Sequence, residues 1–264
     1  MSKVVPILIC LLLAGCARVS SDKAEAEKLV SASGEIAKIQ ALEKKGDELT
    51  ARRMYKSLFS RLSGVKDIEI VREKIEDLNI KILFSKMIDD KSILYKVKRG
   101  DSLGKIAKEF NTTTELIKKA NSLKSSVIYA KQKLKVPKIK FSVLVDKSDN
   151  TLFLKADGEV FKTYVVSTGK NNSTPVGDFK IVTKIKNPAW FRKDVGAVVS
   201  PGSADNILGT RWMGLDIQGY GIHGTVAPDD LGKQITAGCI RMDNKDVEEL
   251  FSILPRGTEV KIIN

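Results

Sequence analysis

The sequence of 264 residues contains one histidine, His223, and a cysteine, Cys239, sixteen positions further on. A thiol with an ordinary pKa of ~8.5 is a weak nucleophile at neutral pH until a nearby imidazole takes its proton. His223 can accept that proton and later return it to a leaving amine. The spacing leaves room for a loop that returns the chain to an adjacent strand. We therefore predict that His223 and Cys239 form a catalytic dyad.

The neighbours of the cysteine suit the same chemistry. Backbone N–H groups around Gly238 and Cys239 are candidate donors to the oxyanion of a tetrahedral intermediate, because glycine lets the backbone approach an acyl carbon closely. Arg241 points to the same face as the sulfur if residues 239–241 form a strand, where it can pair with a substrate carboxylate. Taken singly, each residue also has a structural interpretation: a core histidine, a packed cysteine, a surface arginine.

The single histidine also limits the chemistry. Most zinc and di-metal hydrolase sites need two or three imidazoles, so we predict no metal site. The dyad needs no organic cofactor either, and we predict none.

The N-terminus indicates export. Lys3 precedes an apolar run over residues 4–13, followed by Ala14-Gly15-Cys16. This pattern is typical of a signal peptide over residues 1–15. Its last four residues resemble a bacterial lipobox, which implies a lipid on Cys16 that attaches the protein to a membrane, facing the periplasm or the wall. The alternative is an ordinary signal peptide with a chance cysteine.

Export strengthens the prediction that Cys239 has a chemical role. Cys10 leaves with the signal and Cys16 carries the lipid, so Cys239 is the last of the three cysteines. No disulfide can then form within the chain, although the compartment is oxidising. An unpaired thiol there is either packed as a small hydrophobe or used as a nucleophile.

Composition and charge exclude several classes. A hydrophobic content of 42% excludes disorder throughout, and no apolar run approaches the ~20 residues of a spanning helix. The formal net charge is +13, and residues 91–139 hold 13 basic against 3 acidic residues. We expect this segment to contact a wall polymer with negative groups. The charge run lacks interleaved aromatics, and together with export this argues against nucleic acid.

Residues 16–90 show apolar residues at helical spacing and predict a helical spacer or hairpin. Part of it resembles a tetratricopeptide-style hairpin, at Ala41, Gly46, Ala51 and Tyr55. Such repeats normally need about three units for stability, and one is visible here. A protein partner of this segment is the alternative interpretation.

Residues 94–137 predict a small module with the order strand, helix, helix, strand. A Gly100-Asp101 turn precedes the first helix, Asp101 or Ser102 is its expected cap, and Pro137 ends the last strand. The pattern closely resembles a lysin motif (LysM). That resemblance implies binding to glycan strands that contain N-acetylglucosamine.

From Phe141 the pattern changes to short alternating strands with turn signals every eight to twelve residues, as in a β-sandwich or barrel. A helix is predicted over residues 244–253, capped by Asp243 or Asn244, and a last strand over residues 259–263. The fold class that we predict is multidomain α+β, with a helical N-terminal segment, a βααβ lysin motif and a β-sandwich-like C-terminal domain over residues 141–264.

The C-terminal domain resembles an L,D-transpeptidase catalytic domain. The resemblance is carried by His223-Gly224 and, sixteen positions later, by a Thr-x-Gly-Cys motif that an apolar residue and arginine follow. Upstream matches are the Thr-Pro-x-Gly-x-Phe motif of residues 174–179 and Leu-Gly-Thr over residues 208–210. The matching residues of the signature are His223, Gly224, Thr236, Gly238, Cys239 and Arg241. Many members have a second histidine where this sequence has Ala237, so no auxiliary imidazole is expected.

The resemblance implies an acyltransferase that works on peptidoglycan stem peptides, in cell-wall crosslinking or remodelling. Cys239 attacks the L-to-D bond of a tetrapeptide stem, D-alanine leaves, and an amine takes the acyl group. Members usually orient the imidazole with a backbone carbonyl, so no aspartate is assigned as a third member; Asp216 is the nearest candidate. Two alternatives stay open: a cysteine peptidase that trims the same stems, and a non-catalytic peptidoglycan-binding lipoprotein.

Overall fold

The computed structural model describes residues 32–62, 68–192 and 196–264. The signal peptide and lipidation site predicted over residues 1–16 lie outside them. The chain divides into two units, residues 1–78 and 79–264. Among the described residues, no helix is long and apolar enough to cross a membrane.

The first unit is helical where it is described. Residues 32–44 form a helix, a turn at Gly46 follows, and α2 runs over Glu48–Arg61. Asp47 caps α2 by accepting a hydrogen bond from the Thr50 amide. Buried Tyr55 donates to Glu43 across the hairpin, at 2.8 Å. This is the helical hairpin that the apolar spacing predicted.

Helix α3 spans Glu69–Leu83, and the division between the units falls within it. Its last turn belongs to the second unit: Asn79 donates to the Phe161 carbonyl at 2.9 Å, and Leu83 packs in the core of the β domain. We predicted a helical spacer up to residue 90. The division after residue 78 assigns the end of α3 to the second unit, because Leu83 is buried in the core of that unit.

The predicted lysin motif has the expected order of elements. Strand β1 (Ser92–Lys96) pairs antiparallel with β2 (Lys133–Pro137), and helices α4 (Leu103–Glu109) and α5 (Thr114–Ala120) lie between them in the chain. Ser102, rather than Asp101, caps α4, and Thr113 caps α5. The small core combines buried residues of both strands and both helices: Tyr95, Val97, Leu103, Ile106, Ala107, Ile117, Leu134 and Val136.

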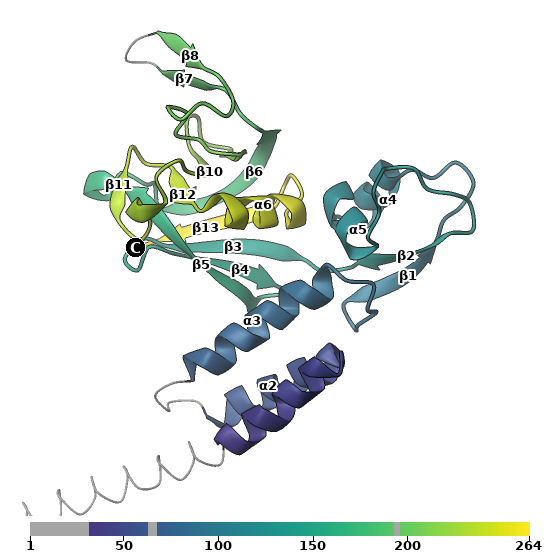
Figure 1. Ribbon diagram of the computed structural model, residues 1–264. Helices are drawn as coiled ribbons and strands as arrows, with labels where there is room; N and C mark the ends of the chain where they lie inside the picture. The colour runs from purple at the N-terminus through teal and green to yellow at the C-terminus, as the bar shows by residue number, and fades with distance from the viewer. Residues whose placement is uncertain (1–31, 63–67, 193–195) are drawn as a thin grey trace, which may run out of the picture. The chain divides into compact units, whose positions relative to one another are not determined.

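The C-terminal domain is built on one strongly bent sheet (Figure 1). Its nine strands in the described part of the chain follow the order β11-β5-β12-β10-β9-β6-β13-β3-β4, and β4 also pairs with β5. That extra pairing closes eight of the strands into a barrel-like ring, with β11 outside it. The strands are β3 (Phe141–Asp146), β4 (Thr151–Ala156), β5 (Glu159–Gly169), β6 (Gly177–Lys186), β9 (Arg211–Leu215), β10 (Gly221–His223), β11 (Gln234–Thr236), β12 (Ile240–Met242) and β13 (Glu259–Ile263).

Two further elements shape this domain. Helix α6 (Asn244–Ile253) has the predicted bounds, is capped by Asp243, and buries Val247, Leu250 and Phe251 in the core. A separate hairpin of β7 (Trp190–Arg192) and β8 (Ala197–Val199) follows β6. It leaves Phe191 and Val198 exposed.

Candidate active site

A pocket of about 560 Å³ holds the predicted catalytic residues. Its polar wall contains His223, Thr236, Cys239 and Arg241. Gly219 and Ala237 line it as well, and its apolar wall is formed by Ile185, Pro188, Ala189, Trp190, Phe191, Ile207, Leu208 and Trp212. The hairpin β7–β8 therefore contributes two aromatic side chains to the space in front of the sulfur.

The pairing of β10 with β12 brings the two halves of the site together. These strands are neighbours and run parallel, with Ile222 opposite Ile240 and His223 opposite Arg241. Both isoleucines are buried, so packing below the strands holds this register. A parallel pair needs a crossover connection, and the segment between His223 and Cys239 supplies it.

The imidazole of His223 is fixed in one tautomer. Its Nδ1 lies 2.7 Å from the carbonyl oxygen of Gly224. A carbonyl oxygen only accepts hydrogen bonds, so Nδ1 carries the proton and Nε2 keeps a lone pair. The ring stacks on Trp212 with centroids 5.9 Å apart. Burial lowers the pKa of His223 to about 4, so at neutral pH the imidazole is an uncharged base.

Cys239 is half-buried and lies directly before the first residue of β12. Its Sγ lies 3.5 Å from the carbonyl oxygen of Gly219. Burial raises the pKa of the Cys239 thiol, while the Gly221 backbone and the Arg241 charge act in the opposite direction. Dyad chemistry in this site therefore starts from a thiol and a neutral imidazole.

The turn that carries the cysteine is held by two threonine hydroxyls. Thr236 accepts from the Gly238 amide at 3.1 Å and donates to the Cys239 carbonyl at 2.6 Å. Thr174 accepts from the Gly169 amide at 2.7 Å and donates to the Gly238 carbonyl at 2.9 Å. Because the Gly238 N–H is used within the turn, the Cys239 N–H is the better candidate for an oxyanion donor.

Glycine at position 238 is required by both conformation and space. Its φ is +127°, a region that other residues rarely adopt. A Cβ there would lie 2.6 Å from Cε1 of Tyr220. The space directly before Cys239 therefore leaves no room for a side chain at position 238.

A buried lysine that we did not predict as a site residue, Lys147, supports the loop that carries Thr174. The Lys147 side chain is 2% exposed, and its Nζ donates to the carbonyls of Thr174 at 2.6 Å and of Asn172 at 3.3 Å. Its own carbonyl accepts from Gln234 of β11 at 3.0 Å. Lysine is common on surfaces, and nothing in the alternating pattern around β3 marks this one as buried.

Asn244 has a second role that the sequence analysis missed. We predicted it only as a possible cap, but its Oδ1 accepts from the amides of Thr210 and Thr225, and its Nδ2 donates to the Thr225 carbonyl. A Cβ on Gly224 would lie 2.1 Å from that Oδ1. Gly224 therefore leaves room for the amide that locks the chain just after His223.

Arg241 lies beside the histidine, as its place opposite His223 requires. Its Nε is buried and has no hydrogen-bond partner among the described residues. Asp216 does not approach the imidazole through its carboxylate: Oδ1 accepts from the Lys180 amide at 2.9 Å, and Asp216 lines a different pocket. Among the described residues, no group of three or more His, Cys, Asp or Glu is placed to hold a metal ion.

Two segments of the chain match known family models. Residues 140–262 match the model of the L,D-transpeptidase catalytic domain, and residues 95–137 match the LysM domain. The chain is similar to YkuD of Bacillus subtilis (strain 168), a protein named for L,D-transpeptidases: 36% identity over 177 residues, covering 64% of this chain and 98% of that protein.

Two further similarities concern the catalytic part. YqjB of the same organism, also named for L,D-transpeptidases, is 42% identical over 126 residues, which cover 46% of this chain and 69% of that protein. The NMR structure of the catalytic domain of an E. faecium L,D-transpeptidase is 26% identical, with a TM-score of 0.39, and the match covers 47% of this chain and 96% of that one. With a relative matched over nearly its whole length, the chain belongs to the L,D-transpeptidase family and places a LysM domain ahead of its catalytic domain.

Proposed function

We propose that this protein is a peptidoglycan L,D-transpeptidase whose nucleophile is Cys239 and whose base is His223. One observation carries the assignment: both residues line one pocket, and the Nδ1–H of His223 is held by a carbonyl, which leaves Nε2 as the acceptor. Thr236, Gly238 and Gly224 shape the backbone around the pair, and Arg241 adds a positive charge to the pocket.

The first half-reaction forms an acyl-enzyme. The Cys239 thiol gives its proton to Nε2 of His223 as the sulfur attacks the carbonyl carbon of the L-to-D peptide bond. The developing oxyanion accepts from the Cys239 N–H, which stabilises the charge that forms there. The C–N bond then breaks, and the imidazolium protonates the leaving amine of D-alanine.

The second half-reaction transfers the acyl group. An acceptor amine attacks the thioester carbon and gives a proton to His223. The C–S bond breaks, and the sulfur takes the proton back, which restores thiol and neutral imidazole. If water attacks instead, the same intermediate yields a shortened stem, which is the peptidase alternative.

Product analysis separates these outcomes. Full-length protein is incubated with purified disaccharide-tetrapeptides, and products are identified by mass spectrometry. We expect crosslinked dimers and free D-alanine, and neither product with Cys239→Ala. Shortened monomers without dimers would reject transfer, and equal products from Cys239→Ala would reject the nucleophile.

We further propose that the protein works at the cell envelope, attached by a lipid on Cys16 and bound to peptidoglycan through its LysM domain. The lipobox-like sequence supports the first part and the LysM match supports the second. Mass spectrometry of the N-terminal peptide tests the lipid. Cys16→Ser is expected to move the protein from the membrane to the soluble fraction. A role of the N-terminal helices in binding a protein partner stays a prediction.

A further inference from the structure

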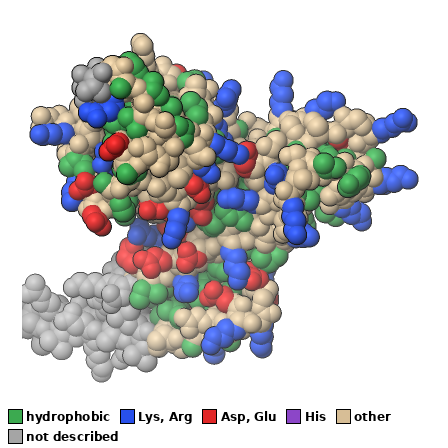
Figure 2. Space-filling view, turned by 45° about the horizontal axis from the view of Figure 1, so that its top comes forward, with side chains coloured by type: hydrophobic (Ala, Val, Ile, Leu, Met, Phe, Trp, Pro, Cys, Tyr) green, Lys and Arg blue, Asp and Glu red, His purple; other side chains and the backbone are tan. Residues whose placement is uncertain are grey.

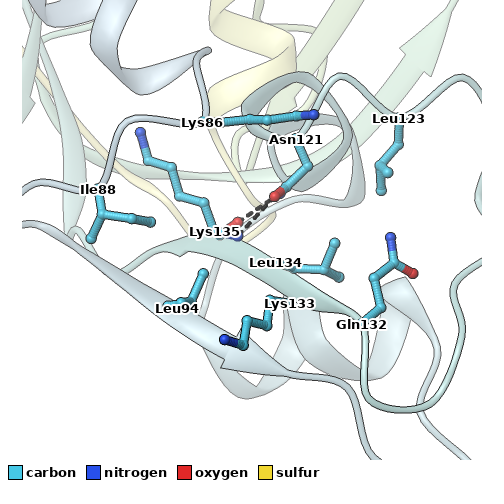
Figure 3. A pocket seen from close by; sticks show the side chains of 9 residues that line it. All are labelled: Lys86, Ile88, Leu94, Asn121, Leu123, Gln132, Lys133, Leu134 and Lys135. Carbon is cyan, nitrogen blue, oxygen red and sulfur yellow. Dashed lines mark hydrogen bonds between the residues drawn. The ribbon is translucent and has the colours of Figure 1, made fainter.

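A second pocket, in the LysM region, is lined by lysines and by no carboxylate. It has a volume of about 230 Å³, and three of its nine lining residues are Lys86, Lys133 and Lys135. In Figure 3, Lys86 lies along one side of the pocket and Lys133 along the other. The space is smaller than that of sites for drug-sized ligands, so it suits one charged group with a short stretch of backbone.

Two of these ammonium groups are available to a ligand. Lys135 is buried, and its Nζ donates to the carbonyls of Ile82 and Ser85 at 2.6 and 3.0 Å, so it is used by the fold. Lys86 and Lys133 are exposed, and among the described residues their ammonium groups make no hydrogen bond or ion pair. The site therefore presents unneutralised positive charge.

The register of the small sheet adds to this charge. Lys96 of β1 stands directly opposite Lys133 of β2. Like charges in that position destabilise a strand pair, unless a counter-charge lies between them. Two acidic groups of the module are engaged elsewhere: Asp101 accepts from Tyr95 and the Lys98 amide, and Glu115 pairs with Lys186. An anion from outside would relieve the repulsion.

The other walls of the pocket point to an organic anion. Ile88, Leu94 and Leu123 provide apolar surface beside the lysines, and Leu94 is 55% exposed. The side chain of Gln132 adds an amide. Aliphatic surface next to point charges fits a carbon chain that carries phosphate groups better than it fits a free inorganic ion.

The charge continues beyond the pocket. Exposed Lys98 and Arg99 lie just after β1 in the chain. Figure 2 shows lysine and arginine side chains gathered at the right of the view, where Figure 1 has β1 and β2 together with α4 and α5. A ligand with charges repeated along its length could contact several of these groups together, and its affinity would fall steeply with salt.

We propose that this pocket binds an anionic wall polymer whose repeating units carry phosphodiester groups on an aliphatic backbone. This inference rests on the proposed function, because it presumes a protein that works at the wall. It gives the LysM region a second contact with the wall, formed by the sheet and the segment that precedes it.

The test uses the full chain and a soluble poly(glycerol phosphate). Binding is measured by titration calorimetry at two salt concentrations for the wild type, for Lys86→Glu/Lys133→Glu, and for a control, Lys108→Glu/Lys118→Glu. The control makes the same charge change on α4 and α5 of the same module. Thermal unfolding of each variant checks that it folds.

We expect the pocket variant to lose at least tenfold in affinity and the control less than threefold. Equal losses in the two variants would overturn the proposal, since general electrostatics would then explain the binding. Equal wild-type binding to polygalacturonate, a carboxylate polymer, would overturn the assignment of phosphodiester. If the proposal holds, the pocket variant crosslinks soluble tetrapeptides as well as the wild type does. If the wild type itself forms no crosslinks, the proposed function is rejected, while the binding result still decides the proposal about the pocket.

Discussion

The hydroxyl of Thr174 donates a hydrogen bond of 2.9 Å to the carbonyl oxygen of Gly238, the residue directly before the nucleophile that we propose. The hydroxyl oxygen of Thr174 also accepts a hydrogen bond from the Gly169 amide, at 2.7 Å. One side chain thus joins β5 to the turn of Cys239. These two bonds give a structural reason for the threonine of the Thr-Pro-x-Gly-x-Phe motif.

Replacing this hydroxyl by a methyl group tests the link. Thr174→Val leaves the Gly169 N–H and the Gly238 carbonyl without their partner, and unsatisfied buried groups cost about 1–3 kcal/mol each. We expect kcat to fall by about tenfold or more, with a smaller change in KM. Thr174→Ser keeps the hydroxyl and is the matched control. Equal kinetics of the two variants would show that the hydroxyl does not position the nucleophile.

The low pKa of His223 predicts how stability depends on pH. Burial lowers this pKa from 6.5 to about 4 in the folded chain. Between these values the unfolded chain binds more protons, so the free energy of unfolding falls as the pH drops from about 6.5 to about 4, by up to roughly 3 kcal/mol. Urea unfolding at several pH values measures this. His223→Gln should lack that part of the slope, and an unchanged slope would contradict the burial argument.

Removing the charge of Arg241 is expected to shift the titrations of His223 and Cys239. Burial is the largest cause of the altered pKa values of His223 and Cys239, and the Arg241 charge lowers both pKa values. Arg241→Gln should move the acid limb of kcat/KM, and the pH dependence of Cys239 alkylation, to higher pH. Arg241→Lys keeps the charge and should keep both profiles. If the glutamine variant alters KM alone, the arginine acts on substrate only.

Lys147 is expected to matter for both stability and catalysis. Lys147→Met leaves the carbonyls of Asn172 and Thr174 without their donor, which should cost about 1–3 kcal/mol and lower the melting temperature. The loop over residues 172–174 would then relax, and kcat should fall more than KM rises. Lys261→Met, at an exposed position of β13, is the control. Wild-type kinetics in Lys147→Met would show that the loop does not need this support.

Much of the architecture could be predicted because it depends on local patterns. The bounds of α6 follow from Asp243 as cap and from Pro255 beyond its end, and β13 follows from alternation over Glu259–Ile263. That His223 and Cys239 line one pocket could be predicted from their residue types and from the family resemblance. The sequence carries less information on strand order, because pairings such as β4 with β5 and β10 with β12 join segments by long-range packing.

The supporting residues could not be predicted for a related reason. Lys147 and Asn244 act through backbone groups that are distant in sequence, and neither residue type marks such a role. Gly224 was predicted from the family resemblance, but its reason, the amide oxygen 2.1 Å from an added Cβ, is visible only in three dimensions.

The parallel pair β10–β12 has a consequence for protein engineering. The pairing of the two strands sets His223 beside Arg241. The segment that connects the strands contains the exposed residues Val226, Pro228 and Asp229. Insertions in this segment would lengthen the connection without changing the pairing of β10 with β12. Peptide segments of varied sequence could therefore be inserted there to bind new ligands, while His223 and Arg241 keep their positions on the paired strands.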